Sequence, residues 1–158
     1  VAVVAGVTKN SDSAAGMICE LTASTAANNG GFLLLASGIY SGGDRLTYAA
    51  ETRGTTSALS REMRPFTAPH SGVVSTQGDN GAGTLTGRVN GATPSGGNAN
   101  STAAGNYANS TLYLFSRAGS SVFLNGGFSS LTIRGGSITT NLLSALESYA
   151  KRLAKLVY

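Results

Sequence analysis

Two kinds of hydrophobic pattern follow one another along the chain. Up to about residue 138, short apolar runs alternate with glycine, serine, threonine and asparagine, and no helical spacing recurs. Beyond that point apolar residues return at helical intervals, as in Leu142, Leu146, Tyr149 and Leu153. Short runs bounded by turn residues are typical of β-strands, whereas the second pattern predicts an amphipathic helix. The chain is therefore expected to form an all-β body closed by one C-terminal α-helix over about residues 139–155.

Several apolar runs in the first part are strand candidates. They are Ala15–Leu21, Phe32–Ala36, Leu46–Ala50, Gly72–Thr76, Thr84–Asn90, Thr111–Ser116 and Phe128–Arg134. Glycine-containing turns separate them, and Asn90-Gly91 predicts a tight hairpin because both residue types accept positive φ. Short strands at this spacing favour an antiparallel β-sandwich or jelly roll.

The predicted helix should pack on a sheet through its leucine stripe, and Thr139 or Thr140 can cap its N-terminus. Lys151, Arg152 and Lys155 make its end basic, and Arg134 precedes it. Such a cluster can bind nucleic acid or another anionic surface, or it can simply favour the helix dipole. The second interpretation is preferred because no aromatic residues are interleaved with the cations. We expect no nucleic-acid partner.

Composition narrows the class of protein. A chain of 158 residues fits one domain, and only 11% of it is charged, with a net charge of +4. Cys19 is the single cysteine, so no internal disulfide can form, and its apolar surroundings predict a core position. No apolar stretch approaches the ~20 residues of a transmembrane helix, so membrane insertion is not expected.

The first residues form an uninterrupted apolar run, Val1 to Gly6. An exposed apolar strand of this kind needs a partner. Residues 1–15 are therefore expected to be an N-terminal arm or docking strand, with Val1, Val3 and Val4 as assembly contacts. Residues 16–158 would then form the single domain.

The sequence offers little for catalysis. Its seven acidic residues show no alternating pattern of paired carboxylates, and the one histidine, His70, has no Gly-x-Ser-x-Gly nucleophile motif to serve. Gly78-Asp79-Asn80-Gly81 presents oxygen atoms on a loop, but one carboxylate is too few for a tight calcium site, so a turn is preferred. We expect no enzymatic activity, no cofactor and no metal.

The order of the later motifs carries a resemblance to a known family. The motifs are Leu85-Thr-Gly-Arg-Val-Asn-Gly91, Gly105-Asn-Tyr-Ala-Asn109, Arg117-Ala-Gly119, Phe123-Leu-Asn-Gly126, Leu131-Thr-Ile-Arg-Gly135 and a helix bearing Glu147. From about residue 16 this order resembles the laminin-G-like (concanavalin A-like) jelly-roll domains of tailed-bacteriophage virion proteins. These are turn and packing motifs, which specify a fold better than an activity.

The resemblance implies a function at the particle surface. The first hypothesis is a non-enzymatic virion structural protein, a capsid decoration or fibre module that stabilises the particle and adheres to host surfaces. It would be assembled in the bacterial cytoplasm, with other virion proteins as partners, and it is expected to form a symmetric homo-oligomer. The alternative is a lectin-like, carbohydrate-binding domain that recognises a receptor.

Tyrosines and asparagines are the candidates for glycan binding. A flat aromatic ring beside amides suits the apolar face and the hydroxyls of a sugar. The candidates are Tyr107, Asn106, Asn109 and Tyr40, with Tyr48, Tyr113, Asn98 and Asn100 as further members. Against this, tyrosines on strands usually pack inside the protein, and the chain has no tryptophan.

Overall fold

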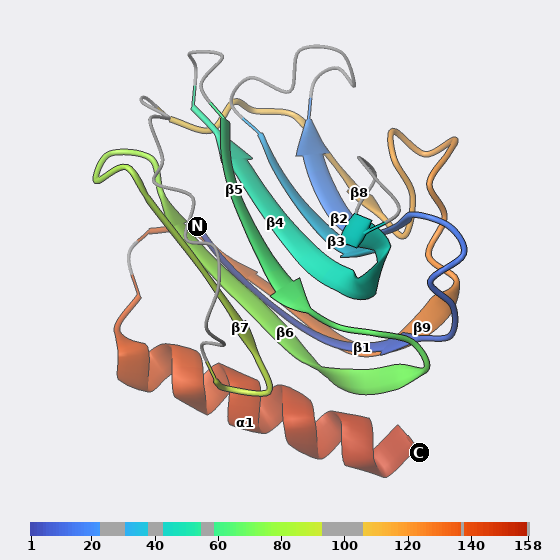
Figure 1. Ribbon diagram of the computed structural model, residues 1–158. Coiled ribbons are helices and arrows are strands. Elements are labelled where there is room, and N and C mark those ends of the chain that lie inside the picture. The colour runs from blue at the N-terminus through green and yellow to red at the C-terminus, as the bar shows by residue number, and fades with distance from the viewer. Residues whose placement is uncertain (23–30, 38–42, 55–58, 93–105, 137, 158) are drawn as a thin grey trace.

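The computed structural model describes residues 1–22, 31–37, 43–54, 59–92, 106–136 and 138–157. Two antiparallel sheets pack face to face, and one long helix lies across the outer face of the smaller sheet (Figure 1). This is the all-β sandwich with one C-terminal helix that the hydrophobic pattern predicts. Over the described residues, no helix combines the length and the hydrophobicity that crossing a bilayer requires.

The smaller sheet has four strands, and the larger has five. The first has the order β7 (Thr84–Val89), β6 (His70–Asp79), β1 (Ala2–Lys9) and β9 (Gly126–Arg134). The second has the order β5 (Leu59–Pro65), β4 (Thr47–Arg53), β3 (Phe32–Ser37), β2 (Gly16–Thr22) and β8 (Thr111–Leu114). A short 3-10 helix, Gly43–Leu46, leads into β4, and the helix α1 spans Thr140–Val157.

Strand β1 contributes to two apolar layers at once. Val3 and Ala5 point into the core between the sheets, whereas Ala2 and Val4 point to the layer beneath α1. A strand buried on both faces has no polar alternation, which explains the uninterrupted apolar run. The core between the two sheets also contains Cys19, which is fully buried as predicted. Burial raises the pKa of its thiol to about 12.

The prediction of an N-terminal docking arm is wrong for this run. β1 is hydrogen-bonded to β6 on one side and to β9 on the other, so residues 2–9 belong to the domain itself. The side chains of Val3 and Val4 are 0% and 1% exposed, and they cannot serve as contacts with another molecule. An apolar run has the same sequence pattern whether the strand that pairs with it belongs to another chain or to the same sheet.

Most other elements agree with the sequence. Every strand predicted for the body is present. The sequence predicts β1 only as an arm or docking strand outside the domain, and it does not predict the charged strand β5. Asn90 and Gly91 have φ of 55° and 85°, and Val89 and Ala92 exchange hydrogen bonds around them, which confirms the tight hairpin. Thr139 caps α1, because its Oγ1 accepts a hydrogen bond from the Leu142 nitrogen at 3.2 Å.

The face that α1 buries differs from the predicted stripe. Leu143 and Ala150 are 5% and 3% exposed, and Glu147 between them is also buried, at 5%. Tyr149, which was expected to face the sheet, is 51% exposed. The sheet-facing row is rotated relative to the leucine pattern because it is built around the buried carboxylate of Glu147.

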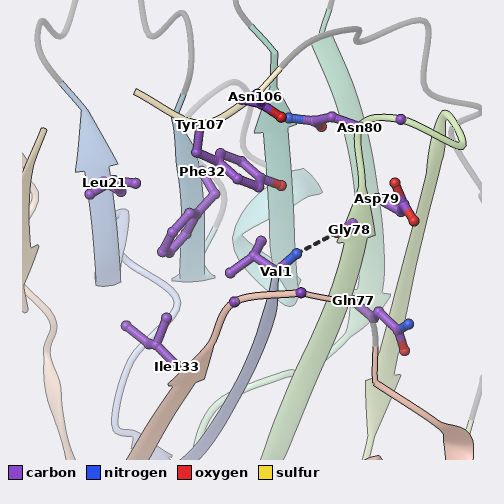
Figure 2. Close-up of a pocket in the computed structure, with 13 residues that line it drawn as sticks. Val1, Leu21, Phe32, Gln77, Gly78, Asp79, Asn80, Asn106, Tyr107 and Ile133 are labelled. Atoms are coloured by element: carbon purple, nitrogen blue, oxygen red, sulfur yellow. Dashed lines mark hydrogen bonds between the residues drawn. The ribbon is translucent and has the colours of Figure 1, made fainter. Parts of the chain in front are cut away.

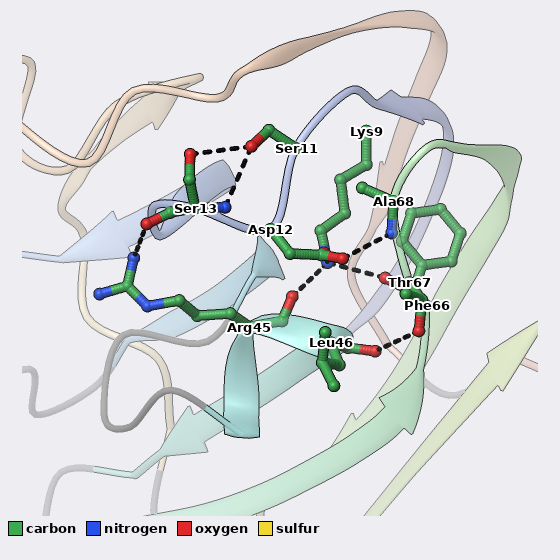
Figure 3. Close-up of polar contacts among 9 residues, drawn as sticks. All are labelled: Lys9, Ser11, Asp12, Ser13, Arg45, Leu46, Phe66, Thr67 and Ala68. Carbon is green, nitrogen blue, oxygen red and sulfur yellow. Dashed lines mark hydrogen bonds and ion pairs between the residues drawn. The ribbon is translucent and has the colours of Figure 1, made fainter.

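At the end of β1, the side chain of Lys9 contacts three connecting segments, which contain Asp12, Arg45 and Phe66 (Figure 3). Its side chain is 1% exposed, and Nζ donates to the carbonyl oxygens of Phe66, at 2.7 Å, and of Arg45. The same nitrogen lies 2.5 Å from Asp12 Oδ1, while the other Asp12 oxygen accepts from the Ala68 nitrogen at 2.9 Å. A buried ammonium is tolerated here because each of its protons meets an oxygen.

Candidate functional site

A cavity of about 410 Å³ opens at the end of the sandwich where β1 begins and β6 ends (Figure 2). Residues from both sheets and from the segment before β8 line it. Its described lining is Val1, Leu21, Phe32, Gln77, Gly78, Asp79, Asn80, Gly81, Asn106, Tyr107, Ile133, Gly135 and Gly136. The site thus combines one apolar wall with one rim of amides and a carboxylate.

The apolar wall comes from side chains of the sandwich core that reach its open end. Leu21 and Ile133 pack against the core, and Phe32 is 6% exposed. The Tyr107 ring stands edge-on to Phe32, with centroids 5.8 Å apart and an interplanar angle of 89°. This contact fixes the ring position before any ligand arrives.

A hydrogen-bonded chain holds the hydroxyl of Tyr107. Thr52 Oγ1, on β4, donates to Asn80 Oδ1 at 3.0 Å and lies 2.6 Å from the Tyr107 hydroxyl. Since a threonine hydroxyl has one proton, Tyr107 is the donor to Thr52. Burial raises the pKa of the Tyr107 phenol, and the negative charge of Asp79 raises it further. The hydrogen bond with Thr52 acts in the opposite direction but is the weaker influence, so the phenol stays neutral.

Asn80 brings an unsatisfied polar atom to the cavity. Its side chain is 6% exposed, and Nδ2 is buried with no hydrogen-bond partner among the described residues. If the amide were turned over, Oδ1 would take the unpaired place, so either orientation leaves one atom free. A buried polar group without a partner is rare and costs about 1–3 kcal/mol, which makes it a natural contact for a ligand.

Glycine makes room for this arrangement. A Cβ at Gly78 would lie 3.2 Å from the Tyr107 hydroxyl and 3.3 Å from Leu85 Cδ1. The carbonyl of Gly78 accepts a hydrogen bond from the Val1 nitrogen at 2.6 Å, which extends the β1–β6 pairing to the cavity edge (Figure 2). A side chain at position 78 would therefore force the Tyr107 hydroxyl or Leu85 to move by a few tenths of an ångström.

The predicted turn is present, but it spans residues 80–83, because Gly78 and Asp79 still belong to β6. Asp79 Oδ1 accepts a hydrogen bond from the Ala82 nitrogen at 3.0 Å and so closes the β6–β7 hairpin. Within the described ranges, no group of three histidine, cysteine, aspartate or glutamate side chains is placed to hold a metal ion.

The structure brings together two of the predicted glycan-binding residues. Asn106 and Tyr107 both line the cavity. Asn109 is exposed and is not part of the lining, whereas Tyr40, Asn98 and Asn100 lie outside the described residues.

Two further tyrosines have other surroundings. Tyr48 is 0% exposed and donates to the Ser75 carbonyl at 2.6 Å, so it is a core residue. Tyr113 lies on β8, paired with Glu20 of β2, away from the cavity lining.

Sequence reasoning missed Asn80 and Gly78 as parts of the site. Both lie in the Gly78-Asp79-Asn80-Gly81 segment, which was interpreted only as a turn or a calcium loop. Thr52, which links Asn80 to Tyr107, comes from a different sheet. No local sequence pattern indicates that Thr52, Asn80 and Tyr107 come together in the fold.

Comparisons with known proteins support the fold class. The sequence matches no family model and no curated protein. The structure is similar to the CBM40 domain of the Ruminococcus gnavus IT-sialidase, a carbohydrate-binding module, with a TM-score of 0.66 and 14% sequence identity. The similarity covers 92% of this chain and 81% of that one.

The class that the fold defines is therefore an antiparallel, jelly-roll-like β-sandwich with one C-terminal helix. At this sequence identity the similarity establishes the fold alone. The jelly-roll part of the predicted resemblance is confirmed, whereas its laminin-G and phage parts stay predictions.

Proposed function

We propose that this chain is a non-enzymatic carbohydrate-binding module and that the cavity beside Tyr107 holds one sugar residue. The observation that carries the proposal is that one small cavity is lined both by apolar side chains and by Asn80, whose buried Nδ2 has no hydrogen-bond partner among the described residues. The similarity to a carbohydrate-binding module supports the proposal at the level of architecture.

Each side of the cavity would have its own part in binding. Phe32, Leu21 and the Tyr107 ring would contact the C–H face of a sugar ring, and Asn80 and Asn106 would hydrogen-bond its hydroxyl or acetamido groups. The volume falls within the ~300–1,000 Å³ that small-molecule sites occupy. Asp79 contributes a negative charge to the lining, so neutral sugars are favoured over acidic ones.

A glycan array with the purified chain, followed by calorimetry on the best ligand, tests the proposal. Asn80→Ala and Tyr107→Ala should each weaken binding about tenfold, because each removes about one hydrogen bond or ring contact. Asn109→Ala is the matched control, since it removes an exposed amide outside the cavity. Thermal unfolding of each variant separates a lost contact from a lost fold.

Two results would overturn the proposal. One is the absence of any binding to neutral glycans on the array. The other is a glycan whose affinity is the same for the folded Asn80→Ala and Tyr107→Ala variants as for the unchanged chain.

The virion role remains a finer proposal that rests on the sequence resemblance alone. In it the module would sit on the particle surface as a decoration or fibre component, as a homo-oligomer beside other virion proteins, after assembly in the bacterial cytoplasm. Host-surface glycans would then be the ligands of the cavity. Mass measurement of the purified chain and co-sedimentation with particles would test this, and a monomer that ignores particles would contradict it.

A further inference from the structure

A basic groove runs along the C-terminal half of α1, beside the β6 and β7 strands. It consists of three adjoining hollows of about 370, 160 and 170 Å³, all of which Lys151 lines. Lys155 borders two of them, and Asn90 and Val73 border two on the side of the sheet. We call this feature the α1 groove, defined by Lys151, Lys155, Arg152, Asn90 and Val73.

Among the described residues, the cations of the α1 groove have no carboxylate partner. In the part of the chain that the structure describes, Lys151, Arg152 and Lys155 form no ion pair. Glu147 is the one carboxylate in the described lining, and it is already held by Arg88 at 3.2 Å and by Ser75 at 2.5 Å. The three cations exceed the partial charge of about −0.5 at a helix C-terminus, so the groove keeps a positive potential.

Polar groups on the sheet side stand next to these cations. Asn90 Oδ1 accepts from the Val73 nitrogen at 2.9 Å, which fixes the amide and leaves its NH₂ group for another partner. A Cβ at Gly72 would lie 3.2 Å from Asn90 Nδ2 and 3.1 Å from His70 Nε2. His70 Nε2 is buried and has no hydrogen-bond partner among the described residues. The glycine thus leaves room for both side chains, and of the two Asn90 lines the hollow of about 370 Å³.

We infer that the α1 groove binds an acidic sugar unit, with Lys151 and Lys155 holding its carboxylate or sulfate group. Asn90 and Ser71 would hydrogen-bond the hydroxyls, and Ala154 would contact the ring carbons. The site is separate from the cavity at Tyr107. It lies beside Ser71–Val73 of β6, whereas the cavity lies at Gln77–Asp79, roughly 20 Å further along the strand.

Other anionic partners fit the groove less well. No aromatic residue is among its described lining, so single-stranded nucleic acid would find no stacking platform. Three cations are few for duplex DNA, whose binding rests on many phosphate contacts. A membrane-bound helix buries its apolar face in lipid, but that face of α1 packs on the sheet through Leu143 and Ala150. A hollow of about 370 Å³ between cations and hydroxyl-binding groups suits one acidic ring.

Affinity electrophoresis and calorimetry with polygalacturonate test the inference, with dextran as the neutral polymer. The chain should bind polygalacturonate and not dextran. The double variant Lys151→Glu/Lys155→Glu should lose at least tenfold in affinity, whereas Lys151→Arg/Lys155→Arg should retain most of it. Arg134→Glu is the matched control, because Arg134 is an exposed cation at the other end of the domain, paired with Ala2.

Three results would overturn the inference. The first is that the chain binds neither polygalacturonate nor heparin. The second is that Arg134→Glu loses as much affinity for polygalacturonate as Lys151→Glu/Lys155→Glu does. The third is that the chain binds duplex DNA, or vesicles rich in phosphatidylserine, as tightly as it binds polygalacturonate. The last result would mark a nonspecific polyanion patch. Asn80→Ala should leave polygalacturonate binding unchanged, so failure of this site and failure of the Tyr107 cavity are distinguishable. Thermal unfolding confirms that each variant is folded.

Discussion

The carboxylate of Glu147, on α1, accepts a hydrogen bond of 2.5 Å from the hydroxyl of Ser75, on β6. Its second oxygen lies 3.2 Å from Arg88 on β7. Glu147 is 5% exposed and sits within the apolar layer that Leu143 and Ala150 form beneath the helix. These two polar contacts therefore fix the position of α1 along the sheet, where apolar packing alone would allow it to slide.

Replacing Glu147 by Gln should lower the free energy of unfolding by about 1–3 kcal/mol. Arg88 would lose its counter-charge at a largely buried position, while Ser75 would keep an acceptor. Urea unfolding followed by circular dichroism measures the change. Ser148→Ala, at the exposed neighbouring position, should stay within about 0.5 kcal/mol of the unchanged chain. Equal stability of the two variants would contradict the role given to Glu147.

Lys9→Met should be more damaging, with a loss of about 2–4 kcal/mol. The variant keeps the length of the buried chain but leaves the carbonyls of Arg45 and Phe66 without their donor, and Asp12 without its cation. Lys155→Met removes an exposed lysine and serves as the control, with an expected change below about 0.5 kcal/mol. A Lys9→Met protein as stable as its control would show that the buried ammonium contributes nothing.

Asp12 should make stability depend on pH in the acid range. Burial opposes ionisation, but hydrogen bonds from Lys9 and the Ala68 nitrogen, with the Lys9 charge, hold the pKa of Asp12 below its ordinary 3.8. A carboxyl with a lowered folded pKa stabilises the protein above its unfolded pKa and loses that contribution as pH falls through the folded value. The free energy of unfolding should therefore fall below about pH 4.

The same urea titrations on Asp12→Asn isolate this effect. The variant should be less stable than the unchanged chain at pH 7, and the gap should narrow as the pH falls from 4 to 2.5. A gap of constant size would mean that the Asp12 charge plays no part.

The β-strands and α1 could be predicted because their signals are local. Alternating runs and turn residues such as Asn90-Gly91 follow from the backbone preferences of a few neighbouring positions. β5 escaped because Leu59–Pro65 carries charges throughout and shows no apolar run. β1 was taken for a docking strand because an apolar run contains no information about which surface covers it.

The candidate site was predictable only in part. Tyr107 and Asn106 could be chosen from residue type, since aromatic rings and amides are the usual partners of sugars. Asn80 could not, because its significance lies in an unpaired amide atom, and pairing depends on Thr52 in the opposite sheet. Likewise, the sequence groups Arg134 with the basic end of α1, but the fold places it beside Ala2, near the start of the helix.

Gly126 is required where β9 passes closest to β1. A Cβ at this position would lie 1.8 Å from the carbonyl oxygen of Thr8 and 2.9 Å from its carbon, both of which are backbone atoms in a paired strand. Because no side-chain rotation can relieve the clash, Gly126→Ala should cost more than about 3 kcal/mol or abolish folding.

Gly135→Ala is the matched control for this substitution. It lies just beyond the same strand, and a Cβ there would meet no atom within 4 Å. It should leave stability unchanged or raise it by up to about 1 kcal/mol, because alanine restricts the unfolded chain. Soluble yield and urea midpoints of the two variants give the comparison. If Gly126→Ala unfolds at the same urea concentration as Gly135→Ala, the close approach of β9 to Thr8 is not a constraint on the fold.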